Sequence, residues 1–251
     1  MIAAAVRSTG FEPGTRSHDL IPLRDINPTE RFSVVTALFI AVNIVVFIYE
    51  LLLGAGAREA FVSSFALIPQ RLFSPQTAAR GTVTVPVEAT MFTSMFMHGG
   101  FLHIAGNMLY LWIFGNNVED SMGRMRFILF YFLCGIIAAY SHALANASSA
   151  VPMIGASGAI SGVLGAYLML YPSARVLTLV AFGLYIRTVE LPAMFVLGFW
   201  FVLQFLSALV SAGTGEGVAW YAHVGGFVAG MAFIGLFKRK KVPFWGRKRE
   251  E

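Results

Sequence analysis

Long apolar runs separated by short polar segments dominate the pattern of this 251-residue chain. A run of about 20 apolar residues, at about 1.5 Å of rise per residue in a helix, can cross the roughly 30 Å hydrocarbon core of a bilayer. The pattern therefore predicts an all-α polytopic membrane protein, built as a bundle of six transmembrane helices. The predicted spans are residues 32–53, 91–114, 127–144, 155–171, 191–210 and 218–237.

The segments outside these runs predict how the chain is organised. Residues 1–31 contain prolines that argue against a continuous helix, and we expect them to form an N-terminal tail. Residues 32–237 are expected to form one domain, because no polar segment between the runs is large enough for a second. Residues 238–251 form a basic C-terminal tail, and the long first loop, at residues 54–90, lies either in the membrane interface or in solvent.

Composition and charge agree with a membrane protein. The chain is 57% hydrophobic and 12% charged, whereas a soluble domain has about 25% charged residues. Much of its net charge of +5 lies in the two tails and in the loops at residues 116–126 and 172–188, all on one side of the predicted membrane. This distribution predicts cytoplasmic tails at both ends, with the lipid bilayer as the surrounding partner and no nucleic-acid partner.

Four polar side chains inside the predicted spans indicate a site, because polar groups in a membrane are costly and usually functional. Ser157 lies where the fourth run begins, and His223 lies near the start of the sixth. His103 and Asn107 are spaced i, i+4 on one face of the second run. All three runs cross from outside to inside in the predicted topology, so these side chains can meet in one outward-opening cavity.

Small residues recur at four-residue spacing in the fourth and sixth runs, as in helices that pack closely in lipid. Such packing would bring Ser157 within hydrogen-bond reach of His223. The same spacing also serves generic packing of membrane helices, so it supports a site only together with those two side chains. The glycines assigned to this packing are Gly155, Gly158, Gly162, Gly226 and Gly230.

These residue types suit nucleophilic acyl transfer. A serine hydroxyl is a weak nucleophile that needs a neighbouring base, and His223 can take the Ser157 proton and later give it to a leaving amine. The free N–H groups at the start of the fourth helix, with the Asn107 amide and the His103 ring, can donate to the oxyanion that forms. No carboxylate is evident as a third member, so the sequence predicts a Ser–His dyad.

The remaining candidate ligands do not predict a metal site. His98 either lines the site or packs within the bundle. A site built from His98, His103 and His223 is disfavoured, because no intramembrane carboxylate joins them and the His-Glu-x-x-His motif is absent. The single cysteine, Cys134, excludes a Cys-based zinc cluster. We therefore expect neither a metal nor a cofactor.

At the level of motifs, the chain resembles the rhomboid intramembrane serine proteases. The likeness covers nearly the whole chain, and the order of the motifs and their span assignments also agree. A further segment, at residues 115–127, is similar to the loop after the second span of that family. The site motifs are His103-x-x-x-Asn107, Gly155-Ala156-Ser157-Gly158 and Ala222-His223-Val224-Gly225-Gly226.

The resemblance implies a fold, an activity and roles for these residues. It implies a rhomboid-like six-span bundle in which Ser157 is the nucleophile and His223 the base. It implies an oxyanion hole formed by His103, Asn107 and the Ser157 backbone N–H. The implied reaction is cleavage of single-span membrane protein substrates near the outer face, without ATP or metal, by a multi-pass protein of a bacterial cell membrane. It also implies that the fifth span and residues 211–217 act as a gate.

Two other functions are consistent with a polytopic bundle. A catalytically inactive relative would bind membrane clients, but such proteins usually lack the serine or the histidine, and both are present here. A transporter would be expected to carry inverted repeats or a polar pathway across the full membrane depth. We see no clear internal repeat, and the polar groups cluster in one leaflet. The endopeptidase is therefore the favoured function.

Overall fold

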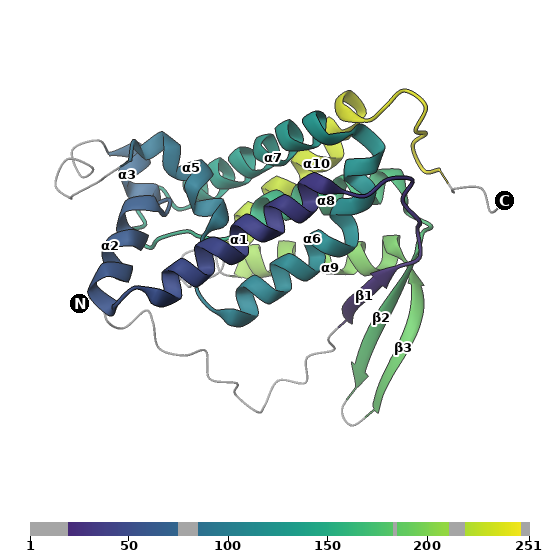
Figure 1. Cartoon of the computed structure of the whole chain (residues 1–251), viewed down its shortest axis with the longest axis horizontal. Helices are drawn as coiled ribbons and strands as arrows, with labels where there is room; N and C mark the ends of the chain where they lie inside the picture. Colours follow the sequence, from purple (N-terminus) through teal and green to yellow (C-terminus); the bar gives the residue numbers. More distant parts are fainter. Residues whose placement is uncertain (1–19, 75–84, 183–184, 211–218, 247–251) are drawn as a thin grey trace.

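The computed structural model describes residues 20–74, 85–182, 185–210 and 219–246, which are mostly helical (Figure 1). Short helices and 3-10 turns lie between the first two long helices, and six long helices of the described residues make up the bundle. The short elements are α2 (Ala55–Phe65), α3 (Pro69–Phe73), η1 (Val87–Ala89), α5 (Thr90–Thr93) and η2 (Ser94–Phe96). The long helices are α1 (Val34–Leu52), α6 (Phe101–Met122), α7 (Arg124–Ala145), α8 (Ser157–Leu170), α9 (Ala193–Val210) and α10 (Trp220–Phe237).

Four of the long helices are long and apolar enough to cross a membrane, namely α1, α7, α9 and α10. The helix α8 is also apolar but has only 14 residues. Among these four, α9 is the least covered by the rest of the protein, with 22% of its apolar window buried, against 44% for α7. The helices therefore differ strongly in how much of their surface is left to lipid.

The helix α6 departs from the predicted second span at residues 91–114. It begins only at Phe101, because Gly99 and Gly100 interrupt the apolar run and Gly100 is extended, with a φ of −179°. It also continues to Met122, past the predicted end, because its polar residues there have partners. The carboxylate of Glu119 accepts hydrogen bonds from the first backbone N–H groups of α1, including that of Thr36 at 2.8 Å, and so caps that helix.

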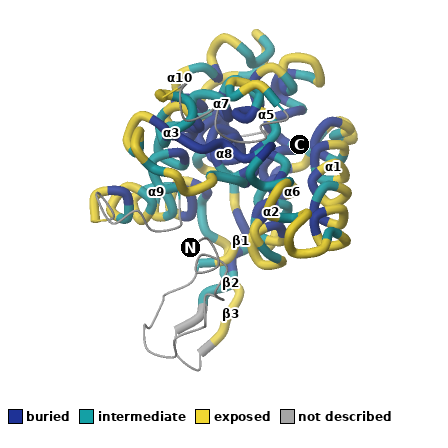
Figure 2. The backbone as a smooth tube through the Cα atoms, turned by 90° about the vertical axis from the view of Figure 1, so that its left-hand side faces the viewer, coloured by how far each residue is buried: buried dark blue, intermediate teal, exposed yellow. Residues whose placement is uncertain are grey.

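The helix α8 forms the centre of the bundle. Figure 2 shows it in the buried colour, with α1 and α9 on opposite sides of the molecule. It packs chiefly against α10 and also against α7 and α6. Most of its residues, from Gly158 to Tyr167, are fully buried. A helix that is apolar on every side and covered on every side has no amphipathic pattern, as expected for a core helix.

Glycines bring the backbones of α8 and α10 into direct contact. A Cβ atom added at Gly230 would overlap the carbonyl oxygen of Gly162, and one added at Gly226 would overlap the carbonyl oxygen of Gly158. A third contact joins Gly165 to the backbone of Phe227. No larger residue fits at these crossing points unless the two helices separate.

A three-stranded antiparallel sheet, in the order β1-β2-β3, departs from the all-α expectation. Its strands are β1 (Leu20–Asp25), β2 (Arg175–Phe182) and β3 (Tyr185–Pro192). The sheet projects from the end of the bundle at which α1 begins (Figure 1). The β-branched and aliphatic residues of Val176–Val180 favour a strand, and this signal was missed because arginines at both ends of the segment suggested a cytoplasmic loop.

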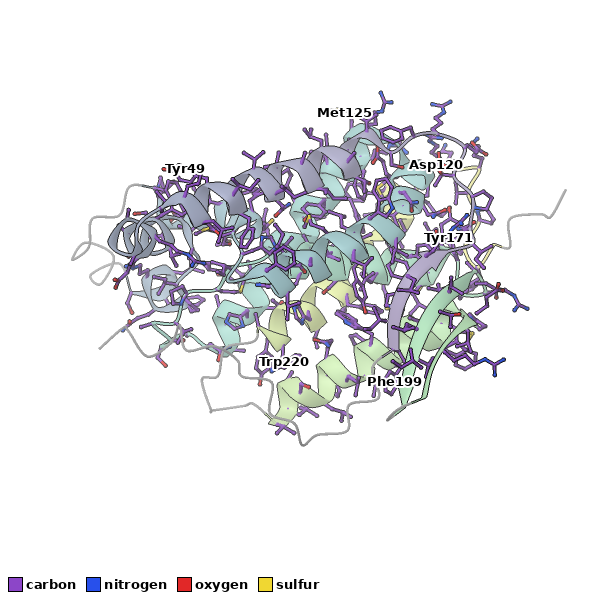
Figure 3. All side chains as sticks on the ribbon, turned by 60° about the horizontal axis from the view of Figure 1, so that its bottom comes forward. Tyr49, Asp120, Met125, Tyr171, Phe199 and Trp220 are labelled. Atoms are coloured by element: carbon purple, nitrogen blue, oxygen red, sulfur yellow. The ribbon has the colours of Figure 1, made fainter. Side chains whose placement is uncertain are left out.

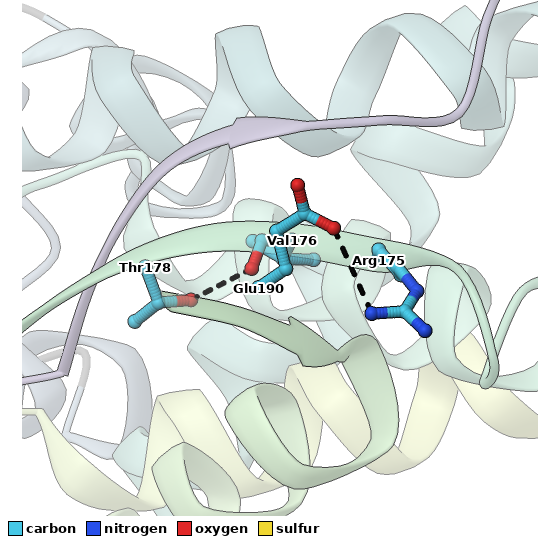
Figure 4. A network of polar contacts seen from close by, with 4 residues as sticks. All are labelled: Arg175, Val176, Thr178 and Glu190. Atoms are coloured by element: carbon cyan, nitrogen blue, oxygen red, sulfur yellow. Dashed lines mark hydrogen bonds and ion pairs between the residues drawn. The ribbon is translucent and has the colours of Figure 1, made fainter. Parts of the chain in front are cut away.

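The sheet is attached to the bundle at one end, where Asp25 of β1 pairs with Val176 of β2. Asp25 of β1 accepts hydrogen bonds from the Asn117 amide at 2.6 Å and the Tyr167 hydroxyl at 2.9 Å, so a strand from the predicted N-terminal tail is joined to α6 and α8. At the same end, Arg175 of β2 and Glu190 of β3 form an exposed ion pair at 3.7 Å, and the Thr178 hydroxyl donates to the Val176 carbonyl within β2 (Figure 4). An exposed ion pair stabilises little, and this one lies within the sheet, so the Asp25 contacts are what attach the sheet to the bundle.

The glycine contacts generate a stability prediction. We expect Gly230→Ala to lower the free energy of unfolding by roughly 1–3 kcal/mol, because the added methyl group has no space beside Gly162. The matched control is Gly198→Ala on α9, where a Cβ atom meets nothing within 4 Å. That change should be neutral or stabilising by up to about 1 kcal/mol. Thermal unfolding in detergent measures both, and equal midpoints for the two variants would contradict the prediction.

Candidate active site

Ser157 and His223 meet at one end of the contact between α8 and α10. Ser157 is the first residue of α8, and His223 lies in the first turn of α10. The Nε2 atom of His223 is 2.8 Å from the Ser157 hydroxyl oxygen. Trp220, labelled in Figure 3, marks the start of α10 and hence the end of the bundle where the pair lies. The close backbone contact one turn below keeps both helix starts together.

The backbone conformation at Gly155 brings the segment before Ser157 close to α6. Gly155 has a φ of +124°, a conformation that favours glycine. A Cβ atom there would lie 2.8 Å from the ring of His103 and 3.7 Å from the amide nitrogen of Asn107. His103 and Asn107 are therefore close to the segment that leads into Ser157, as their i, i+4 spacing predicts. The ring of His103 is exposed, whereas Asn107 is buried.

His98 lies behind Asn107 rather than at the opening of the site. Its side chain is fully buried, and its Nε2 atom is 2.9 Å from the Asn107 amide nitrogen. Its backbone N–H donates to the buried carboxylate of Glu50 at 3.3 Å. The ring centroid of His98 is 5.0 Å from that of His103. Of the two roles expected for His98, packing within the bundle fits this position.

The first loop holds the segment before Ser157 in place. Leu67 and Met153 exchange two backbone hydrogen bonds, at 3.2 and 2.7 Å, and form an isolated antiparallel bridge. The backbone N–H of Gly155 donates to the carbonyl of Ser94 at 2.9 Å. This loop contains no tryptophan, and in its described part the Leu67–Met153 bridge joins it to the segment before Ser157.

The sequence analysis missed Gln204 on α9. Its Oε1 atom is 2.6 Å from the Nδ1 atom of His223, on the side of the ring opposite Ser157. One helical turn earlier, Trp200 lies against the same ring, with centroids 5.8 Å apart. A usable signal was present, because Gln204 is an amide within the otherwise strongly apolar run Ala193–Leu206, and such a group needs a partner in a membrane.

A groove of about 250 Å³ opens beside the site between α6, α9 and β1. Trp200 forms part of its wall and also contacts His223, so one side chain links the groove to the base. Phe199, labelled in Figure 3, precedes Trp200 on α9 and also lines the groove. The groove is lined by Leu20, Ile21, Tyr110, Val196, Phe199, Trp200 and Leu203.

The expected residues thus divide into three sets. Ser157 and His223 are hydrogen-bonded to each other, and His103 and Asn107 lie beside the segment that precedes Ser157. Residues 211–217, expected to form part of a gate, lie outside the described residues. Within the described ranges, no three His, Cys, Asp or Glu side chains are grouped so that they could hold a metal ion.

The comparisons with known proteins all indicate the same family. The rhomboid domain model matches residues 88–240, a range that contains Ser157, His223, His103 and Asn107. The chain is 30% identical over 213 residues to rhomboid protease GluP of Bacillus subtilis, covering 85% of this chain and 36% of that protein. It is 29% identical over 158 residues to rhomboid protein 1, mitochondrial, of Saccharomyces cerevisiae, covering 59% and 42% of the two chains.

A third relative extends the same comparison. The presenilin-associated rhomboid-like protein A, mitochondrial, of Danio rerio is 32% identical over 172 residues, covering 63% of this chain and 42% of that protein. The chain thus spans about two fifths of the length of these relatives, 36–42%. Because two of the three carry mitochondrial names, the comparisons do not support the expected bacterial cell membrane.

Proposed function

The chain belongs to the rhomboid family, and we propose that it is an intramembrane serine endopeptidase that uses Ser157 and His223 as a dyad. The observation that carries this proposal is the 2.8 Å contact between His223 Nε2 and the Ser157 hydroxyl. A serine becomes an effective nucleophile when a base accepts its proton at this distance. The name of the GluP relative, a protease, supports the same reaction class.

The proposed reaction proceeds through an acyl-enzyme. The Ser157 oxygen attacks the scissile carbonyl carbon while its proton moves to His223 Nε2, and the carbonyl oxygen becomes an oxyanion. His223 then gives the proton to the leaving amine as the C–N bond breaks. A water molecule, deprotonated by the same ring, hydrolyses the ester and regenerates the Ser157 hydroxyl. The reaction needs neither ATP nor a metal.

The oxyanion would be stabilised by donors from two helices. The backbone N–H of Ser157 is one of the unpaired groups at the start of α8, where the helix dipole also favours negative charge. Asn107 has two amide hydrogens, and the contact with His98 uses only one of them. His103, on the exposed side, supplies a third donor. We therefore propose that His98 orients Asn107 for this role.

In the proposed membrane arrangement, α6 and α8 also span the membrane. Together with α1, α7, α9 and α10 they make six spans within residues 32–237. At about 1.5 Å per residue, the 14 residues of α8 extend about 21 Å, less than the roughly 30 Å of hydrocarbon. If its C-terminal end is level with the ends of α1 and α6 beside the sheet, Ser157 lies several ångströms below the opposite membrane surface. The membrane side that carries most of the Lys and Arg residues is then the side on which both tails lie.

Substrates are proposed to be single-span membrane proteins that approach through the lipid. The groove between α6, α9 and β1 supports a path of this kind, because Trp200 lines it and also contacts His223. We propose that α9 and residues 211–217 control this access. An extended segment is needed at the dyad, because the peptide bonds of a helix are hydrogen-bonded and covered.

The dyad is tested by cleavage of a model single-span substrate in liposomes. Ser157→Ala and His223→Ala should each lower the rate by at least about 10³-fold, as expected when members of a nucleophile–base unit are removed. A fluorophosphonate should label Ser157 in the wild type and neither variant. If a folded wild-type protein neither cleaves several substrates nor takes the label, the protein is instead a rhomboid-like protein that binds membrane clients.

The oxyanion role of Asn107 is tested by its truncation. Asn107→Ala should lower kcat by about 10²–10³-fold with little change in KM, because the lost donor acts mainly in the transition state. Leu102→Ala is a suitable control, because Leu102 lies on the same helix and is 86% exposed. A variant of Asn107 with wild-type kcat would exclude this role.

Substrate selection follows from access to the backbone. Substrates with Gly, Pro or polar residues near the outer end of their span should be cleaved faster than matched substrates in which these are replaced by Leu and Ala, which are strong helix formers. Cleavage rates of such a pair, measured side by side in the same liposomes, test the expectation. Equal rates for the two substrates would show that local unwinding does not govern selection.

A further inference from the structure

We propose that Gln204 is a positioning residue that fixes the tautomer and orientation of the His223 ring, and this inference rests on the proposed function. The Oε1 atom of Gln204 is 2.6 Å from His223 Nδ1, while Nε2 of the same ring is 2.8 Å from the Ser157 hydroxyl. The ring is therefore held from both sides by residues of two different helices. Within the part of the chain that the structure describes, the ring's hydrogen-bond partners are these two residues.

The polarity of the amide oxygen determines which ring nitrogen carries the proton. A neutral imidazole has one N–H donor and one acceptor nitrogen, and an amide oxygen can only accept. With Oε1 facing the ring, Nδ1 must be the donor, which leaves Nε2 as the acceptor facing Ser157. This is the tautomer that a general base needs. A ring without a partner at Nδ1 would populate both tautomers.

A neutral partner suits this location in the membrane. In soluble serine hydrolases a buried carboxylate usually holds the second ring nitrogen, but an ionised group on a lipid-facing helix would be costly to bury. Gln204 is half-buried on α9, the least covered of the candidate spans. An amide there orients the ring through one hydrogen bond without adding a charge to the apolar surroundings.

The helix α9 contributes two contacts to the ring, one turn apart. Trp200 packs against it with centroids 5.8 Å apart, and Gln204 bonds its Nδ1 atom. From the other helices, the titratable side chains that act on His223 are His103 of α6 and His142 of α7, while α8 supplies the Ser157 hydroxyl. Neither histidine nor the Ser157 hydroxyl accepts a hydrogen bond from the N–H at Nδ1, so Gln204 fills that role.

The kinetic test compares three variants of the full chain in liposomes. Gln204→Met keeps the length of the side chain but removes the acceptor, and should lower kcat by about 10–100-fold, as is typical when a group that orients a catalytic ligand is removed, with KM nearly unchanged. Gln204→Glu keeps an acceptor oxygen and should recover activity to within a few-fold of the wild type. Leu206→Met, on the lipid-exposed side of the same helix, is the matched control and should match the wild type.

The decisive readout is the tautomer itself. Nitrogen NMR of protein labelled with ¹⁵N-histidine, with the His223 signals identified by their loss in His223→Ala, should show the proton on Nδ1 in the wild type. In Gln204→Met it should be distributed over both nitrogens. A proton on Nε2 in the wild type, or an unchanged tautomer in Gln204→Met whether or not kcat falls, would overturn the proposal.

The two measurements separate this inference from the proposed function. If the wild type neither cleaves nor labels but shows the Nδ1 proton and its loss in Gln204→Met, the protease function fails while the positioning role stands. If the wild type cleaves and Gln204→Met cleaves equally fast, the protease function stands and Gln204 has no positioning role.

Discussion

The backbone contact between α8 and α10 is the constraint on which the site depends. At Gly158 with Gly226, and at Gly162 with Gly230, the main chains touch without intervening side chains. The first turns of both helices lie directly beyond this contact, so the separation between Ser157 and His223 is fixed by backbone rather than by flexible side chains. A hydrogen bond of 2.8 Å tolerates little displacement, and a backbone-to-backbone contact is the most rigid means of maintaining it.

Around that contact, several polar groups of the bundle are paired with groups on other elements. Asn107 of α6 meets His98, the His98 backbone donates to Glu50 of α1, and His223 meets Gln204 of α9. Burying such groups is costly when they are unpaired. Each pairing therefore fixes the relative positions of two elements as well as satisfying a donor or an acceptor. The polar groups that serve chemistry also help to specify how the apolar helices are arranged.

Sequence reasoning predicted proximity where a residue's type and spacing determine its place. The contact between Ser157 and His223 could be expected because each begins a run at matched depth. The position of His103 with Asn107 beside Gly155 could be expected because their spacing places them on one helical face. Sequence reasoning failed where partners distant in sequence decide the structure. The sheet forms because β1 pairs with β2 across some 150 residues of chain, and no local pattern specifies that pairing. The start of α6 was misplaced because two glycines override the apolar pattern.

Gln204 illustrates a different limit. Its amide stands out in an apolar helix, but only the folded structure tells which group it faces, because the relevant distance joins α9 to α10. Periodicity describes one helix at a time and does not include such contacts. A search for polar residues in otherwise apolar helices would have marked Gln204 as a candidate without giving its role.

The shortness of α8 gives the bilayer a part in the reaction. Its 14 residues extend about 21 Å, and in the proposed membrane arrangement the depth of Ser157 below the surface would be the difference between that length and the local hydrocarbon thickness. A thicker membrane places the hydroxyl deeper, farther from the water that completes the hydrolysis, and a thinner one brings it nearer the surface. Because cell membranes differ in thickness by several ångströms, the same protein would have a differently placed nucleophile in each of them.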